Sequence, residues 1–299
     1  MTDIPAIEAR DLSMRFGRTQ ALDHFNCRME GGHIYGLLGR NGAGKSTFLR
    51  LLTAQAFTRT GEVRVQGRRP GLGTLGEMCF ISDTPDFGGL TRVRDVLNAE
   101  RRLHPNWSDA VCSRMVERFE LDVRRKTKGL SRGMQTAVGL VCGLASQAQI
   151  TIFDEPSLGL DAVSRERFYD ALIDAYAERP RTIVLSTHLI DEVARVLETA
   201  VMIDHGKLIL QRDVDELRQL CVTVSGAPEA VTAATRGLRV LHEESFAGAM
   251  ARSVFLDAPQ QFPQDVKTEP IGLQRLFVLL TDAQRGGEAD GYGNAAIAL

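Results

Sequence analysis

The stretch Tyr35–Leu52, YGLLGRNGAGKSTFLRLL, decides the fold. It reads as an apolar strand, a glycine-rich loop and an amphipathic helix in one run. Within it, Gly39–Ser46 matches the pattern G-x-x-x-x-G-K-[ST], in which backbone N–H groups close around phosphate oxygens at a helix N-terminus. We therefore expect a phosphate-binding loop here, in preference to a plain tight turn.

The side chains of this loop predict how it holds a nucleotide. Lys45 is expected to reach the terminal phosphates, Ser46 to offer a hydroxyl to Mg²⁺, and Thr47 to give the phosphates a further hydroxyl. The rest of the cradle is expected to come from Gly39, Asn41, Gly42, Ala43 and Gly44. A phosphate loop indicates that the chain binds a nucleotide. The function that this nucleotide drives must be inferred from other motifs in the chain.

The bulk composition narrows the class of protein. The 299 residues are 43% hydrophobic and 25% charged, which is typical of a globular chain, and the net charge of -2 argues against nonspecific binding of nucleic acid. The five cysteines form no CxxC pair, so we expect reduced thiols and no structural zinc. The longest apolar run, Ala137–Ala145, falls short of the roughly 20 residues of a membrane-spanning helix, so we expect membrane contact only through a partner.

Strand-like and helix-like segments alternate along most of the chain. Alternating apolar residues predict strands up to Val65, and apolar residues at helical spacing predict helices from Val93 to about Lys128. Beyond these, we expect strands at 150–155, 182–188 and 199–210, separated by helices at 164–178 and 190–198. This order favours a parallel sheet with helices on its faces.

The pattern of expected secondary structure changes after about Gln219. Short strand-like pieces at 221–226, 238–245 and 251–258 alternate with helix-like pieces at 228–237 and 271–283, which predicts a small α+β module at 219–284. Residues 285–299 are rich in glycine and alanine without periodicity, and we expect a flexible tail there.

Two carboxylates follow the apolar strand at Ile150–Pro156, ITIFDEP. Asp154 suits an acid that holds Mg²⁺, and Glu155 suits a base that polarises an attacking water. Paired acids at a strand end are also common on ordinary surfaces, but a phosphate loop upstream favours the catalytic interpretation.

A third motif lies between these two. Leu130–Gln135, LSRGMQ, opens a helical segment and resembles the LSGGQ signature of ABC transporter nucleotide-binding subunits, departing from it at Arg132 and Met134. The resemblance covers roughly residues 4–218. It implies that Ser131 and Gly133 contact the terminal phosphate of an ATP molecule held by the other subunit of a dimer.

Further family elements follow in order. The resemblance implies that Asp161 is the acid of the loop after the Asp154–Glu155 strand, and that His188 contacts the γ-phosphate and orients Glu155. Phe16 stands where the family places an aromatic ring against adenine.

One element departs from the family. Asp83, in CFISDTPDF, stands where the family carries a glutamine that faces Mg²⁺ and the attacking water. A carboxylate is also a hard oxygen ligand for the metal, and Asp83 is equally well explained as a turn residue before Pro85. Both interpretations stay open.

The resemblance implies an α/β fold of the ABC ATPase type. It would comprise a mixed β-sheet core, an antiparallel β subdomain and a helical subdomain at about 84–129 within an ATP-binding domain at 1–218. LSRGM, the absent glutamine and the last helix are similar to ATP-binding subunits of ABC-2 exporters, so we expect an exporter rather than an importer.

In that family two ATP molecules are sandwiched in a dimer whose closure powers a separate transmembrane permease. We therefore expect ATP and Mg²⁺ as ligands, a homodimer or a heterodimer with a related ATPase, and a cytoplasmic location on the inner face of the membrane through the permease. The alternatives are a soluble ABC-type ATPase and a nucleotide-dependent regulatory module without a transport role.

Overall fold

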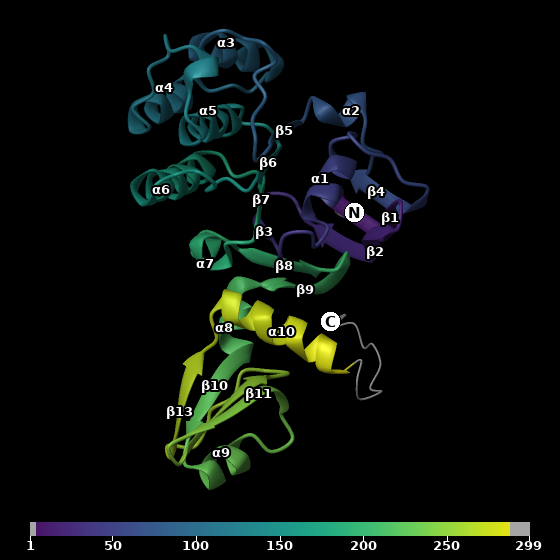
Figure 1. The fold of residues 1–299 in the computed structure, drawn as a ribbon, viewed down its shortest axis with the longest axis vertical. Coiled ribbons are helices and arrows are strands. Elements are labelled where there is room, and N and C mark those ends of the chain that lie inside the picture. Colours follow the sequence, from purple (N-terminus) through teal and green to yellow (C-terminus); the bar gives the residue numbers. More distant parts are fainter. Residues whose placement is uncertain (1–3, 288–299) are drawn as a thin grey trace.

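The computed structural model describes residues 4–287 and is built around a six-stranded sheet (Figure 1). Its strand order is β5 (Met78–Ile81), β6 (Ile150–Asp154), β7 (Thr182–Thr187), β3 (Ile34–Leu38), β8 (Thr199–Asp204) and β9 (Lys207–Asp213). The first five strands are parallel and β9 is antiparallel to β8. Every residue of β3, β6 and β7 is buried, which explains why these strands read as continuous apolar runs in the sequence.

A second sheet and one helix cover one face of this core. The strands β1 (Ile7–Phe16), β2 (Thr19–Met29) and β4 (Thr60–Val65) pair antiparallel in the order β2-β1-β4. Helix α1 (Lys45–Leu52) contacts β2 and β4 and buries its apolar face between the sheets. The rings of Phe25 and Phe48, 4.9 Å apart, join β2 to α1. This packing fixes the helix that begins at the phosphate loop.

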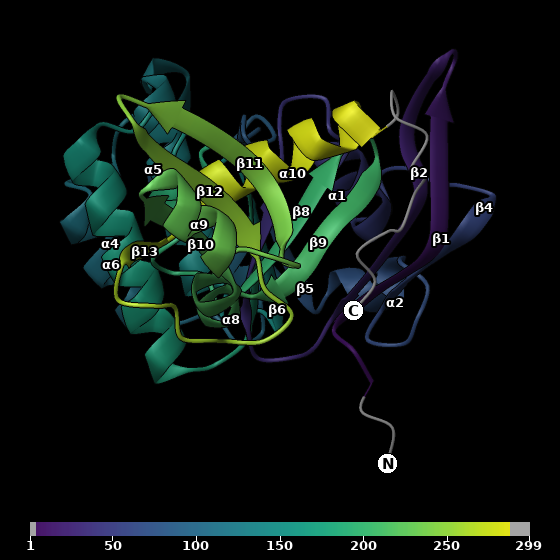
Figure 2. The same cartoon turned by 90° about the horizontal axis from the view of Figure 1, so that it is seen from below.

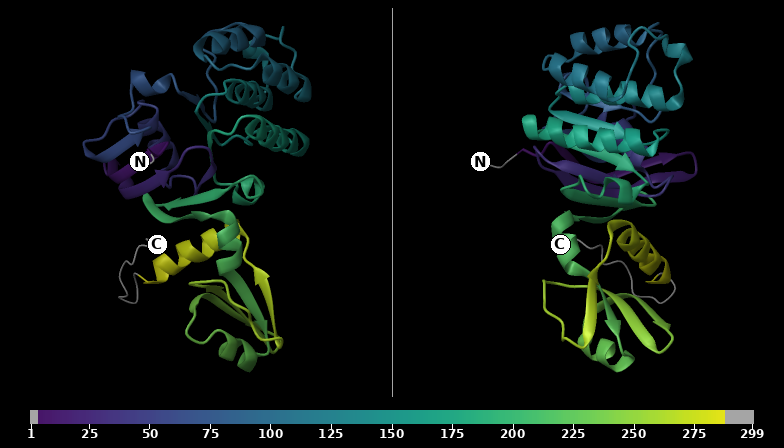
Figure 3. Two further views of the ribbon diagram at one scale, coloured as in Figure 1. Left: turned by 180° about the vertical axis from the view of Figure 1, so that it is seen from behind. Right: turned by 90° about the vertical axis from the view of Figure 1, so that its left-hand side faces the viewer.

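Helices occupy the other side of the sheet (Figures 1 and 3). They are α3 (Val93–Leu103), α4 (Asp109–Arg118), α5 (Arg132–Ala145), α6 (Ala162–Glu178) and α7 (Ile190–Val193), with a 3₁₀ turn at Thr127–Gly129. Helix α5 is buried from Thr136 to Ala145. It lies so close to the sheet that a Cβ on Gly143 would be 2.3 Å from the Phe153 ring. Helix α5 is therefore held firmly against β6.

A smaller module follows helix α8 (Val214–Leu220) and hangs below the sheet in Figure 1; Figure 2 views it from beneath. Its elements are β10 (Cys221–Gly226), α9 (Pro228–Ala234), β11 (Arg239–Phe246), β12 (Ala249–Phe255), β13 (Val266–Pro270) and α10 (Leu273–Gly287). The strands form an antiparallel sheet in the order β11-β12-β10-β13. Helix α10 packs back on α7, so the apolar core of the module is continuous with that of the larger domain.

Four expectations from the sequence differ from the structure. The strand expected at 199–210 is the hairpin β8–β9, because His205 and Gly206 adopt φ of 46° and 78° and turn the chain back. The helix expected at 190–198 is helical only at α7. Helix α10 runs to Gly287, into the segment expected as a tail; residues 288–299 lie outside the described part. The sequence patterns also missed α2 (Leu72–Leu75) and β13.

Between residues 4 and 287, no helix is both long enough and apolar enough to cross a bilayer.

Candidate active site

The phosphate loop connects the carboxyl end of β3 to the start of α1. Gly44 precedes the helix with φ of 113°, and a Cβ there would be 2.5 Å from the Ala21 carbonyl oxygen. A Cβ on Gly39 would be 2.3 Å from the Ile203 carbonyl oxygen. Only glycine fits both positions, so the loop packs directly against β2 and β8. Along it, Asn41 and Gly42 are exposed, Ala43 is buried and Thr47 is half-buried.

Lys45 begins α1 and is only 5% exposed. Its ammonium donates to the Gly39 carbonyl oxygen at 2.7 Å and lies 3.5 Å from Glu155 Oε1. Burial lowers the pKa of Lys45, while the charge of Glu155 opposes that shift. The ammonium is thus held inside the curve of the loop, where phosphate oxygens would meet it.

Asp154 ends β6 and is buried, with 6% of its surface exposed. The hydroxyl of Ser46 donates to Oδ2 at 3.1 Å and that of Ser186 donates to Oδ1 at 2.7 Å. Burial raises the pKa of the Asp154 carboxyl, the charges of Glu155 and Asp83 raise it further, and the two hydroxyls lower it. Such a carboxylate favours a nearby cation, and Ser46 and Asp154 together offer the oxygen ligands that Mg²⁺ prefers.

Glu155 follows directly and lies at the centre of a hydrogen-bonded cluster. Its Oε2 accepts from the Thr187 hydroxyl at 2.9 Å, and its Oε1 lies 2.9 Å from His188 Nδ1. Its backbone has φ of 51°, a region that non-glycine residues rarely adopt. The Glu155 N–H donates to the Ser186 carbonyl oxygen at 2.7 Å and so fixes this conformation. The result is a carboxylate aimed at the loop and oriented by the end of β7.

Sequence reasoning missed Ser186 and Thr187. Both are polar residues at the end of β7, directly after its apolar part, and the sequence pattern predicts them only as strand residues. The signal that was available is the parallel pairing itself, because the carboxyl ends of β6 and β7 lie side by side and Asp154 pairs in register with Ser186.

Two further predicted residues lie at exposed positions. Asp83 lies in the bend after β5, where its charge contributes to the raised pKa of Asp154. Phe16 ends β1 in the antiparallel sheet and is 47% exposed. Each is available to a ligand, and neither has a role in the hydrophobic core.

The signature segment forms the start of α5. Ser131 caps the helix, because its hydroxyl accepts from the Met134 N–H at 3.3 Å. A Cβ on Gly133 would be 2.5 Å from the Gly159 carbonyl oxygen, and the Thr136 hydroxyl donates to the Leu158 carbonyl oxygen at 3.1 Å. Glycine is therefore required at position 133 for packing, which the motif alone did not reveal. The missing side chain lets α5 contact the turn before α6.

Asp161 caps α6 at the end of that turn. Its carboxylate accepts from the Ser164 N–H at 2.7 Å, and this hydrogen bond lowers the pKa of Asp161. The turn and the start of α5 thus form one connected surface carrying Ser131, Gly133 and Asp161.

This surface and the phosphate loop lie in different arms of the molecule. Figure 1 shows α5 and α6 on one side of the central sheet and α1 with the β2-β1-β4 sheet on the other. Among the described residues, no hydrogen bond or ion pair joins Ser131, Gly133 or Asp161 to residues 39–47. The structure therefore unites Lys45, Ser46, Asp154, Glu155 and His188, and leaves the signature apart from them.

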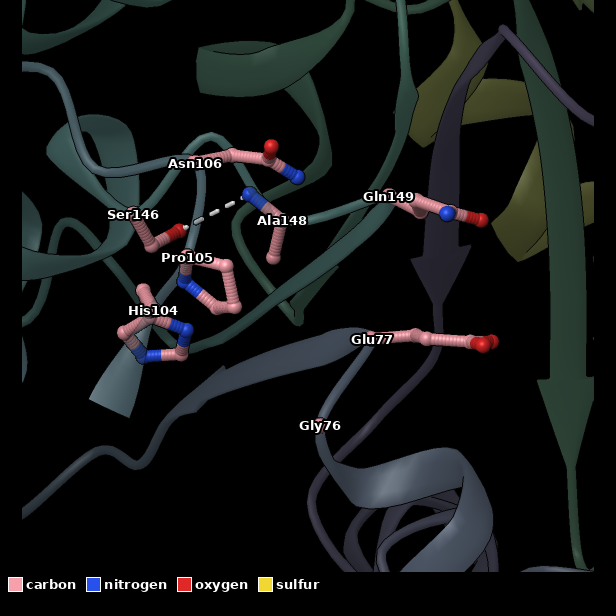
Figure 4. A pocket seen from close by; sticks show the side chains of 8 residues that line it. All are labelled: Gly76, Glu77, His104, Pro105, Asn106, Ser146, Ala148 and Gln149. Carbon is pink, nitrogen blue, oxygen red and sulfur yellow. Dashed lines mark hydrogen bonds between the residues drawn. The ribbon is translucent and has the colours of Figure 1, made fainter. Parts of the chain in front are cut away.

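A small pocket of about 170 Å³ lies at the opposite end of the sheet (Figure 4). Its lining includes Glu77 and Gln149, which directly precede β5 and β6, and His104. The phosphate loop leaves the carboxyl end of β3, so this pocket is separate from the nucleotide cluster.

Comparisons with known proteins agree with this arrangement. The ABC transporter family model matches residues 22–158. The ABC transporter ATP-binding protein YtrB of Bacillus subtilis is 27% identical over 225 residues, covering 74% of this chain and 76% of YtrB. The bacitracin transport ATP-binding protein BcrA of Enterococcus faecalis is 28% identical over 218 residues, covering 71% of each.

A solved dimeric structure has the same fold. It is the ATP-binding cassette MJ0796 in a post-hydrolysis state bound to ADP and phosphate, with a TM-score of 0.60 and 19% identity, covering 70% of this chain and 98% of that one. This chain belongs to the ABC transporter ATP-binding family.

Proposed function

We propose that the chain binds and hydrolyses ATP as the motor subunit of an ABC transporter, with residues 1–218 as the ATP-binding domain and 219–284 as an appended module. The observation that carries this function is the cluster at the ends of β6 and β7. There the Glu155 carboxylate lies 3.5 Å from Lys45 and 2.9 Å from His188, beside a loop shaped for phosphates. A module that only holds ATP needs no such oriented base.

Hydrolysis by this cluster is phosphoryl transfer to water. Lys45 and the N–H groups of the loop stabilise charge on the phosphates, and Phe16 stacks on the adenine. Glu155 accepts the proton of the attacking water. Thr187 and His188 hold that carboxylate in position, and His188 also contacts the γ-phosphate.

The donor set supports Mg²⁺ as the ion that accompanies ATP. Ser46 and the buried Asp154 present oxygen atoms on one side of the loop. Burial raises the pKa of Asp154, and the charges of Glu155 and Asp83 raise it further. Asp83 is the proposed additional ligand, because its charge already acts on Asp154. When bound, Mg²⁺ supplies positive charge that offsets the charge developing on the phosphates.

A dimer completes the site. The Ser131, Gly133 and Asp161 surface lies in a different arm from the phosphate loop of its own chain, which supports contact with ATP on a partner subunit. Two ATP molecules would then be enclosed between two chains. Because the signature gains phosphate contacts only when a γ-phosphate is present, ATP favours the closed pair over ADP. The partner is a second copy of this chain or a related ATPase.

The closed and open states would drive a transmembrane permease on a separate chain, which would hold this subunit on the inner face of the membrane. The relative BcrA is described as a bacitracin transport protein, and this supports an exporter. The surface offered to the permease is the segment from Asp83 to Leu97, which leads from the sheet into α3.

The test of this function measures hydrolysis and association together. Purified chain incubated with Mg-ATP is expected to release phosphate and to form a dimer by light scattering, whereas EDTA abolishes turnover. Pull-down from membranes is expected to recover a permease. A chain that retains ATP without turnover, in the presence of its membrane partners, contradicts the proposal.

The surface that carries Ser131, Gly133 and Asp161 gives a separate prediction. Gly133→Ala places a Cβ 2.5 Å from a backbone oxygen of Gly159, so α5 or the turn must move. Hydrolysis is expected to fall about 10- to 100-fold because the contact surface is misplaced, while ATP binding to the monomer is unchanged. Gly129→Ala is the matched control, since a Cβ there meets nothing within 4 Å. Equal turnover by both variants would remove Gly133 from the dimer contact.

A further inference from the structure

A cavity of about 480 Å³ lies beneath the sheet, at the amino-terminal ends of β3, β6 and β7. Its polar lining includes Gln66, Gln149, Arg179, Arg181 and Thr182, and Ile4, Ala6 and Pro180 give it an apolar portion. Among the residues that the structure describes, no Asp or Glu lines it. The cavity is large enough for a small organic molecule, and its described lining contains two arginines and no carboxylate.

Arg181 is the unusual member of this lining, because it is only 4% exposed. Its Nη1 donates to the carbonyl oxygens of Ala175 and Arg179 at 3.0 and 3.2 Å, and its Nη2 donates to that of Leu144 at 3.5 Å. The Ala175 and Leu144 carbonyls belong to the last turns of α6 and α5, whose negative dipole ends offset part of the charge. Its Nε is buried and has no hydrogen-bond partner among the described residues.

Among the described residues, the charge of Arg181 also lacks a carboxylate counterion. Within residues 4–287, no carboxylate oxygen lies within 4.0 Å of a nitrogen of Arg181 or Arg179. Burial, together with the positive charge of Arg179, lowers the pKa of Arg181 to about 10. Two cations that repel each other beside an unpaired buried donor are costly to the fold unless an anion joins them.

The amide side chains add a donor. Gln66 Nε2 donates to Gln149 Oε1 at 2.5 Å, which fixes the Gln149 amide. No described residue accepts from Gln149 Nε2. Figure 4 shows the Gln149 side chain directed away from His104 and Pro105, out of the smaller pocket.

We propose that this cavity is a binding site for a small soluble oxyanion, a carboxylate or a phosphate, held by Arg181, Arg179 and the Gln149 amide. The guanidinium groups match the planar oxygens of such a ligand, and Ile4, Ala6 and Pro180 accommodate a short apolar body. The site is distinct from the nucleotide site, because it lies at the opposite ends of the strands that carry Asp154 and Thr187.

The test is calorimetric titration of the full chain with succinate and, separately, with inorganic phosphate. Saturating Mg²⁺ and a non-hydrolysable ATP analogue fill the nucleotide site first, so that neither probe binds the phosphate loop. Saturable binding of one anion per chain is expected for at least one probe. Binding of the ATP analogue is expected to be unaffected.

Substitutions decide whether the cavity is responsible. Arg179→Ala and Gln149→Ala remove donors near the surface and are each expected to weaken anion binding about tenfold. Arg181→Lys keeps the charge but loses Nε and is expected to weaken binding as well. Arg236→Ala, an exposed arginine of the C-terminal module, is the control and is expected to bind like the unsubstituted chain.

Two results would overturn the proposal. One is the absence of saturable binding of both probes to the unsubstituted chain, which would leave Arg181 as a cap for α5 and α6 only. The other is equal weakening by Arg236→Ala and Arg179→Ala, which would mean general charge attraction. If Arg181→Lys fails to fold, the Arg179 and Gln149 variants still decide. Neither result bears on ATP hydrolysis, which is measured separately.

Discussion

Glu155→Gln is expected to lower the rate of ATP hydrolysis about 100- to 10,000-fold while leaving ATP bound. The amide has nearly the size of the carboxylate, so the Thr187 hydroxyl still has an acceptor. The glutamine amide, unlike the carboxylate, cannot take a proton from water at neutral pH. The variant should therefore hold ATP in the closed dimer, which is measured by light scattering with ATP and by single-turnover phosphate release.

The electrostatics of the cluster support retained binding. The Glu155 charge raises the pKa of Asp154 and attracts the Lys45 ammonium, which lies 3.5 Å away. Removing that charge lowers the local negative potential that an incoming γ-phosphate meets and frees Lys45 for the phosphates. ATP affinity is therefore expected to stay equal or to rise.

The control for this variant is Glu229→Gln in α9, which makes the same chemical change in the C-terminal module. It is expected to hydrolyse ATP at the unsubstituted rate. Fast turnover by Glu155→Gln would transfer the role of base to another group. Slow turnover without a trapped dimer would mean that Glu155 acts in hydrolysis but that blocking hydrolysis does not hold the dimer closed.

The sequence was sufficient for the parts of the fold that depend on local patterns. The apolar runs of β3, β6 and β7 and the loop before Lys45 are continuous segments whose character is visible residue by residue. The hairpin at His205–Gly206 was missed because apolar residues continue on both sides of its turn. Strand β13, VKTEP, was missed because it is an exposed edge strand with little apolar character.

The residues of the site divide in the same way. Lys45, Ser46, Asp154, Glu155 and His188 lie within motifs, and the structure brings them together. Ser186 and Thr187 acquire their importance only from the pairing of β6 with β7, which a single strand does not reveal. The close contact of Gly133 with Gly159 likewise depends on how α5 packs beside the turn before α6, a tertiary relation between residues 26 positions apart.

Lys45→Ala is expected to abolish high-affinity nucleotide binding, and hydrolysis falls with it. The ammonium is buried and anchored to the Gly39 carbonyl oxygen at 2.7 Å, so it meets the phosphates with little loss of side-chain freedom. Losing a buried charge-assisted contact costs about 2–5 kcal/mol, which corresponds to roughly 30- to 4,000-fold in affinity. Equilibrium titration with a fluorescent ATP analogue measures this loss.

Arg50→Ala is the matched control, since Arg50 is an exposed basic residue in the last turn of the same helix. It removes the same charge from the chain at a point about 7.5 Å further along the axis of α1, so long-range attraction of ATP falls equally in both variants. Its affinity is expected to change less than about twofold. An equal loss in the two variants would mean that Lys45 acts only through net charge. Unchanged affinity in Lys45→Ala would contradict the phosphate-loop assignment, because the ammonium held inside the curve of the loop would then contribute nothing to nucleotide binding.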